Sequence, residues 1–177
     1  MVFILKVVNL KVGRVLIDTG SSSDIISLAC LKILKFPEDA MKDISHPLVG
    51  FGGSIIQPVG RIDLPVRFRQ KGEGRNMVVH FMVVKELTGY NVIIGRPTLN
   101  LAKVVIFHHL MLMKFKRSEG KIGSIQGNQI MAKECNQRAM KPTSLEHGKA
   151  SEQNSEGGSL QAMQVSEKLK SFKKEQA

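Results

Sequence analysis

The tripeptide Asp18-Thr19-Gly20 is the part of this sequence best suited to chemistry. It follows an apolar stretch at 15–17 and is followed by Ser21. A carboxylate in this position can take a proton from water or give one to a leaving group, which is general acid–base catalysis. The same residue types also form ordinary polar turns after a strand, because Asp and Gly are favoured there. The surrounding motifs therefore decide between a catalytic carboxylate and a turn.

Two further motifs favour a catalytic site over an ordinary turn. A second apolar stretch ends in Ile94-Gly95 and is followed by a helical segment, which repeats the order seen around Asp18. Such a weak repeat is expected of an ancient duplication. Between the two halves lies a glycine-rich tip, Phe51-Gly52-Gly53, flanked by apolar residues. The alternative for Phe51 is an exposed aromatic residue on a hairpin.

Short strands are expected to position these motifs. The clearest pattern is in residues 61–69, where apolar and polar residues alternate strictly. Pro65 lies on the polar face of that stretch and favours an edge position in a sheet. The continuous apolar run 77–84 predicts a buried strand. The other expected strands are 3–8, 12–17, the two sides of a hairpin at 48–56, 91–94, 104–107 and 110–115.

Two short helices are expected between the strands. Ser27 is a suitable N-cap for a helix over 28–35, which the dipeptide Phe36-Pro37 would end. Pro97 is well placed in the first turn of a second helix that begins at Arg96. Many short strands with few helices predict an all-β fold, either a small closed barrel or a sandwich.

The motifs, taken in order, resemble a known family. VLIDTGSSSDIIS, LVGFGG, YNVIIGRPTLN and HLMLMKF are similar to the retropepsin-like aspartic protease of retroviral and gypsy-class LTR retrotransposon polyproteins. The resemblance covers residues 2–116. The next segment, SEGKIGSIQGNQIMAKECNQ, resembles the linker that joins this protease to the reverse transcriptase. The resemblance implies a closed β-barrel of the retroviral protease type that forms half of a homodimeric enzyme.

The implied mechanism needs two chains, each contributing one Asp18. Two carboxylates a few ångströms apart cannot both ionise, so the pair shares a proton. One carboxylate then acts as general base on water, and the other acts as general acid toward the carbonyl oxygen of the peptide. The implied substrate is an extended peptide or polyprotein, cleaved between large apolar residues.

The resemblance also assigns roles to neighbouring positions. Thr19 matches a residue whose hydroxyl bonds across the dimer, and Gly20 allows the backbone to approach the carboxylates closely. Ser21 matches a residue that can donate to the Asp oxygen. Ile94 and Gly95 match the pair that supports the Asp loop. The flap tip, which closes over substrate and excludes water, is expected at Phe51, Gly52 and Gly53.

Charge and hydropathy limit the partners. The chain has 177 residues, with 26 Lys and Arg against 15 Asp and Glu, so its net charge is +11. This positive net charge makes nucleic acid a possible partner. A basic edge that could contact it is expected at Arg61, Arg67, Arg69, Lys71 and Arg75. The alternative for that edge is a solvated strand face. No apolar run reaches the roughly 20 residues of a membrane span, so we expect no membrane partner.

Cysteine and histidine usage predicts neither a cofactor nor a metal site. Cys30 and Cys135 are too few for a disulfide framework or a Cys-based zinc site, and they suit a reduced, intracellular, cytoplasmic location. Adjacent residues of a strand point to opposite faces, so His108 and His109 cannot share one metal ion.

The composition divides the chain into three parts. Residues 1–116 are expected to form the protease domain, 117–138 a linker toward a reverse transcriptase, and 139–177 a disordered polar tail with too few apolar residues to form a core. Two functions remain open from the sequence. The first is an active aspartic endopeptidase, and the second is a catalytically inactive protease-like module that binds protein or RNA through its basic edge.

Overall fold

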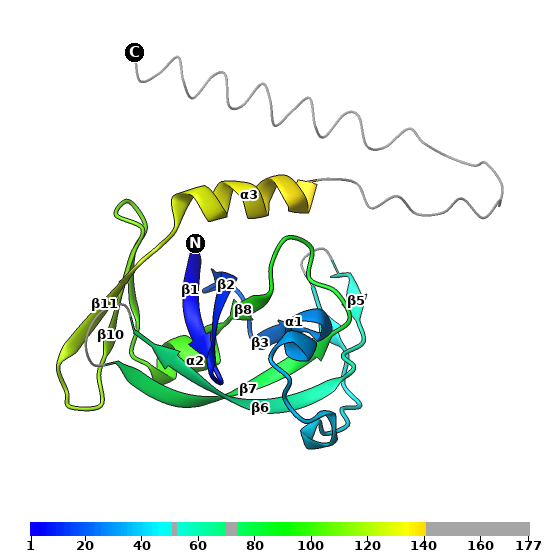
Figure 1. Ribbon diagram of the computed structural model, residues 1–177. Coiled ribbons are helices and arrows are strands. Elements are labelled where there is room, and N and C mark those ends of the chain that lie inside the picture. Colours follow the sequence, from blue (N-terminus) through cyan, green and yellow to red (C-terminus); the bar gives the residue numbers. More distant parts are fainter. Residues whose placement is uncertain (51–52, 70–73, 141–177) are drawn as a thin grey trace, which may run out of the picture. The chain divides into compact units, whose positions relative to one another are not determined.

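Alternating apolar residues build the long strands of the molecule. In strand β6 (Gly60–Phe68), the side chains of Ile62, Leu64, Val66 and Phe68 are buried, as the alternation predicts. The computed structural model describes residues 1–50, 53–69 and 74–140. In these residues β6 pairs along its whole length with β7 (Arg75–Val84), and the two form a long curved pair (Figure 1).

Six strands close into a barrel, which confirms the predicted fold class. Around the barrel the order is β1-β2-β8-β3-β7-β6. The pairs β2–β8 and β3–β7 are parallel, and the other pairs are antiparallel. The remaining barrel strands are β1 (Val2–Val7), β2 (Leu10–Ile17), β3 (Asp24–Ser27) and β8 (Val92–Ile94). The sequence did not predict strand β3, which connects the Asp18 motif to the first helix.

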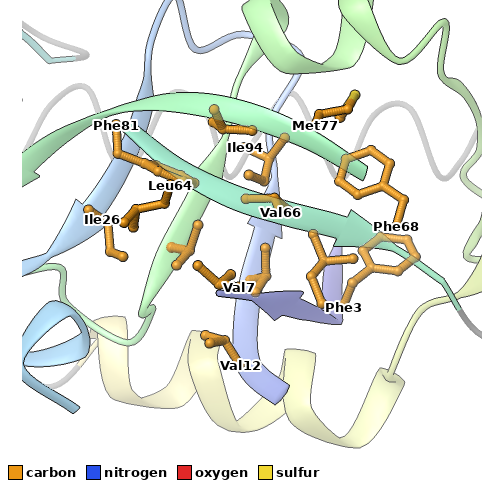
Figure 2. Close-up of a cluster of buried hydrophobic side chains, with 14 of the residues drawn as sticks. Phe3, Val7, Val12, Ile26, Leu64, Val66, Phe68, Met77, Phe81 and Ile94 are labelled. Atoms are coloured by element: carbon orange, nitrogen blue, oxygen red, sulfur yellow. The ribbon is translucent and has the colours of Figure 1, made fainter. Parts of the chain in front are cut away.

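The barrel interior is filled by aliphatic and phenylalanine side chains. Phe3, Leu64 and Phe81 come from three different strands and belong to one cluster of buried side chains (Figure 2). The rings of Phe68 and Phe115 pack edge to face with their centroids 5.6 Å apart. Burying each such side chain contributes about 1.5–3 kcal/mol, so the core holds the ends of the strands in fixed positions.

Two short helices follow two of the barrel strands. Helix α1 (Leu28–Ile33) begins after Ser27, whose Oγ accepts the Cys30 N–H at 3.2 Å, as the sequence predicts. Helix α2 (Arg96–Leu101) begins after Gly95 with Pro97 in its first turn, also as predicted. Gly95 has no side chain, so α2 lacks the cap that Ser27 gives to α1.

The structure corrects two expectations about the β6–β7 pair. Strand β6 is not an edge strand, because it pairs with both β1 and β7. Pro65 is tolerated because its carbonyl oxygen accepts the Val8 N–H on the β1 side, where the paired stretch is short and no proline N–H is needed. Strand β7 is not buried throughout, since Val78 is 56% exposed and His80 is also exposed.

The fold continues past residue 116. Strand β10 (Leu112–Lys116) pairs with both β9 (Val105–Phe107) and β11 (Ile122–Gln126) in a three-stranded sheet. Helix α3 (Gln129–Met140) follows and contacts β1 and β2 (Figure 1). The segment 117–138, which the sequence suggested as a linker, thus belongs to the same compact unit as the barrel.

This segment packs against the rest of the unit through few buried side chains. Strand β11 buries only Gly123 and Ile125, and α3 buries only Cys135 among its described side chains. Both cysteines are free and buried. Of the expected polar tail, residues 139 and 140 end α3, and 141–177 lie outside the described residues. No helix within the described part of the chain is long and apolar enough to cross a bilayer.

Candidate active site

Asp18 lies directly after strand β2, at the start of a loop that leads to β3. Its backbone N–H donates to the carbonyl oxygen of Ile94 at 3.0 Å, which fixes the carboxyl end of β2 against the parallel strand β8. The side chain is half-buried, and its Oδ1 accepts the Gly20 N–H at 2.9 Å. Thr19 and Gly20 are exposed. The carboxylate is therefore held in place and stays open to water.

The pair Ile94-Gly95 lies against this loop. The Arg96 N–H donates to the Ser21 carbonyl oxygen at 3.0 Å. A Cβ atom on Gly95 would lie 2.4 Å from the Ser23 carbonyl oxygen and 2.9 Å from that of Ser21. Only glycine allows the end of β8 to approach the loop so closely.

Ser21 does not have the hydrogen bond that the sequence suggested. Its hydroxyl donates to the Ser23 carbonyl oxygen at 2.7 Å, instead of donating to Asp18. The reason is local, because a serine side chain bonds readily to backbone groups two residues away. In this structure the Asp18 carboxylate has the Gly20 N–H as its donor.

An open cleft of about 880 Å³ lies in front of Asp18. The cleft is largely apolar, and its aliphatic and thioether lining comes from β3, β7, the loop after β7, β8, and the hairpin formed by β4 (Leu48–Val49) and β5 (Ile55–Ile56). These lining residues are Ile25, Leu48, Val49, Ile56, Met82, Val84, Leu87 and Ile93.

One wall of the cleft is the hairpin of β4 (Leu48–Val49) and β5 (Ile55–Ile56). Its turn is closed by the Gly50 N–H, which donates to the Ser54 carbonyl oxygen at 2.7 Å. Gly53 has a φ of +80°, a conformation that glycine adopts without strain. Phe51 and Gly52, the rest of the expected flap tip, lie outside the described residues.

Asp24 is the residue near this site that the sequence analysis missed. It begins β3 and is only 3% exposed. Its Oδ1 accepts the Gly95 N–H at 2.7 Å, and its Oδ2 accepts the Thr98 hydroxyl at 2.8 Å. Burial raises the pKa of Asp24, and the hydrogen bonds from Gly95 and Thr98 oppose that rise. An acidic residue shortly before a run of apolar residues was the available signal.

The residues that the sequence suggested for metal binding and for a basic edge are more dispersed in the structure. Within residues 1–50, 53–69 and 74–140, no three His, Cys, Asp or Glu side chains cluster as a metal site would require. In the expected basic edge, the Arg75 guanidinium donates to the carbonyl oxygens of Lys116 and Leu101. Arg75 therefore ties the barrel to the second sheet. Arg61 and Arg69 are exposed, and Lys71 lies outside the described residues.

Comparisons with known proteins bear on the fold. No family model matches the chain, and no curated protein matches it. Among solved structures, it is similar to the retroviral protease-like domain of Ddi1 from Leishmania major, with 15% identity and a TM-score of 0.50 over 73% of this chain and 96% of that one. The EIAV protease in complex with the inhibitor HBY-793 matches with 21% identity and a TM-score of 0.45, over 60% of this chain and 91% of that one.

These identities are low, so the likeness speaks for the arrangement of strands and not for an activity. The likeness to the Ddi1 domain agrees with the closed barrel of this chain. The chain has a retropepsin-like fold.

Proposed function

We propose that the chain is an aspartic endopeptidase that acts as a homodimer. The observation that carries this proposal is a single, open carboxylate, Asp18, held on a backbone-locked loop beside a large apolar cleft. Among the described residues of one chain, Asp18 is the carboxylate that lines this cleft, and peptide hydrolysis by this chemistry needs two. A second copy of the chain supplies the other.

The chemistry follows from bringing the two Asp18 side chains together. One proton shared between two close carboxylates leaves one ionised and one neutral at mildly acidic pH. The ionised carboxylate takes a proton from water as the water attacks the peptide carbonyl, and the neutral carboxylate protonates the carbonyl oxygen. In the proposed dimer, the hydroxyl of Thr19, which is exposed next to Asp18, bonds across the two chains and keeps their loops in register.

The cleft points to the substrate class. Its aliphatic lining, which includes Ile25, Met82 and Val84, suits an extended peptide with large apolar side chains on both sides of the cleaved bond. The β4–β5 hairpin, with Phe51, Gly52 and Gly53 as its tip, is the flap that closes over the peptide and excludes water. We assign the chain to self-processing of a retrotransposon polyprotein in the cytoplasm.

The test is peptide cleavage by the purified chain of 177 residues at micromolar concentration and mildly acidic pH, with its oligomeric state measured in the same buffer. Asp18→Asn is expected to lower kcat/KM about a thousandfold, because it removes both general acid and general base from the dimer. Asp43→Asn is the matched control, since Asp43 is exposed and does not line the cleft. Pepstatin, an analogue of the tetrahedral intermediate, should inhibit the wild type.

A dimer that cleaves no peptide in an Asp18-dependent way contradicts the proposal. A stable monomer also contradicts it, because one chain cannot bring two Asp18 residues together. In either case the inactive interaction module is the better description. RNA binding that is lost when Arg61 and Arg69 are neutralised would then assign that module to nucleic acid.

A further inference from the structure

A carboxylate that is almost fully buried needs a structural reason, because removing its charge from water is costly unless donors surround it. Asp24 has such donors, and all of them come from one short segment, the beginning of α2. Oδ1 accepts the Gly95 N–H at 2.7 Å, and Oδ2 accepts the Thr98 hydroxyl at 2.8 Å. The Thr98 backbone N–H adds a further hydrogen bond.

The segment that Asp24 holds is the one that supports the Asp18 loop. Ile94, just before Gly95, accepts the Asp18 N–H through its carbonyl oxygen. Arg96, just after Gly95, donates its N–H to the Ser21 carbonyl oxygen. The Asp24 carboxylate thus fixes the peptide that lies between two hydrogen bonds to the loop.

Helix α2 has no cap of its own that could do this. Gly95 is in the N-cap position and carries no side chain. It cannot be exchanged for Ser or Asp, because a Cβ atom would collide with the backbone at Ser23. The chain satisfies the first amide groups of α2 from outside the helix, through a residue on β3.

We propose that Asp24 is a positioning residue for Asp18: its buried carboxylate clamps the start of α2 and thereby fixes the backbone on which the catalytic loop rests. The role in catalysis depends on the proposed protease function, whereas the clamp itself does not. Asp24 lies behind the loop, is sealed from solvent and touches no substrate. It acts on the reaction only through the position of Asp18.

The expected consequence is a loss of turnover more than of substrate binding. Releasing Gly95 and Arg96 lets the Asp18 loop shift, and a shift of about 1 Å between reacting groups can lower a rate about a hundredfold. Met82 and Val84 of the cleft lining are not donors to the Asp24 carboxylate, so we expect KM to change little. In a homodimer the substitution displaces both Asp18 loops, so both carboxylates of the catalytic pair are misplaced.

The first variant is Asp24→Asn, which keeps the volume and one acceptor but turns an NH₂ group toward the donors of Thr98. Its kcat is expected to fall roughly tenfold to a hundredfold, with KM within about twofold of wild type. Amide hydrogen exchange at Asp18 and Arg96, measured by NMR, should become at least about tenfold faster, while the amides in the middle of β6 keep their wild-type rates.

The matched control is Ser27→Ala. Ser27 lies on the same strand and also caps a helix, α1, and the hydrogen bonds it makes there join it to Cys30 and Asn91 instead of to the Asp18 loop. This variant should lose stability while kcat and exchange at Asp18 stay at wild-type values. Thr98→Val, which removes one of the bonds to Asp24, should act in the same direction as Asp24→Asn but more weakly, and Thr98→Ser should restore wild-type values.

Unchanged exchange at Asp18 in folded Asp24→Asn overturns the proposal, and so does an equal drop in kcat in Ser27→Ala. If Asp24→Asn does not fold, Thr98→Val and Thr98→Ser decide by the same measurements. If the wild type cleaves no peptide, the proposed protease function fails. The exchange measurement then still decides whether Asp24 clamps the loop.

Discussion

The two ends of the loop between β2 and β3 carry the same chemical group in opposite surroundings. At the first end, Asp18 is half-buried beside an open cleft, and its carboxylate accepts the backbone N–H of Gly20. At the second end, Asp24 is sealed beneath α2 by donors from Gly95 and Thr98. The loop therefore has an open end suited to proton exchange with water and a closed end suited to holding the backbone.

The difference shows how a small fold can present one reactive group without leaving it loose. A group that exchanges protons must reach water, so few of its bonds can go to the protein. The rigidity it lacks has to come from its neighbours. Here it comes from the backbone bond to Ile94 and, through the start of α2, from Asp24.

The strongest way to break this arrangement is Gly95→Ala. The φ of Gly95 is −96°, which alanine adopts without strain, so the cost is steric. The new methyl group would lie 2.4 Å from the Ser23 carbonyl oxygen, and a backbone atom cannot move aside as a side chain can. We expect a loss of about 3 kcal/mol in the free energy of unfolding and a loss of cleavage of about a hundredfold.

The control for Gly95→Ala is Gly13→Ala, in strand β2. A Cβ atom there would meet the end of the Met131 side chain at 3.2 Å, and that flexible group can move. Urea denaturation should give a change below about 1 kcal/mol for Gly13→Ala. Equal stabilities of the two variants would show that the closed end of the loop tolerates displacement.

Much of the framework could be predicted from the sequence, because its signals are local. Alternation in β6, the Ser27 cap of α1 and Pro97 in α2 are each visible within a few neighbouring residues. The meeting of the Asp18 loop with Ile94 and Gly95 was expected from the resemblance to a known family. What the resemblance did not provide was the bond of Ser21, because a single hydroxyl has several acceptors within reach.

The closed end of the loop could not be predicted in this way. Asp24 and its donor Gly95 are 71 residues apart, and an isolated Asp is usually an exposed residue. The strand and the helix within 117–140 could not be placed for a similar reason. Their buried residues Ile125 and Cys135 are too few to form a local pattern, and they acquire their partners only when the sheet and the barrel come together.

A second prediction uses the pH dependence of stability to isolate the contribution of Asp24 at the closed end of the loop. Burial raises the pKa of Asp24 above its ordinary value of 3.8. Such a group contributes stability that is fully present below 3.8 and is lost as pH rises through the folded-state pKa. At pH 7, Asp24→Asn is expected to lose about 1–2 kcal/mol through its broken bonds with Thr98.

This deficit should grow as the pH falls, because only the wild type gains stability from protonation of Asp24. The measurement is urea denaturation of both proteins at several pH values between 7 and 3. A deficit that stays constant or shrinks toward acid pH would mean that Asp24 does not titrate as a buried carboxylate.

The smallest expected effect comes from Asp63 on β6, which supplies the opposite case. Its side chain is 34% exposed, with Oδ1 2.6 Å from His80 Nδ1 and Oδ2 3.8 Å from Lys42 Nζ. The hydrogen bond from His80 lowers the pKa of Asp63 below 3.8. A lowered pKa contributes stability above 3.8 that is lost as pH falls through the folded-state pKa, the reverse of Asp24.

Asp63→Asn should therefore cost about 0.5 kcal/mol or less at pH 7, because solvent and salt screen an exposed pair, and the deficit should shrink toward acid pH. Raising the salt concentration to about 1 M should reduce the deficit of Asp63→Asn and leave that of Asp24→Asn nearly unchanged, since buried groups are screened much less. If both variants respond alike to pH and salt, the burial of Asp24 is not what distinguishes the closed end of the loop. The rigidity of the closed end of the loop would then have to come from the close packing of Gly95 and not from the buried charge of Asp24.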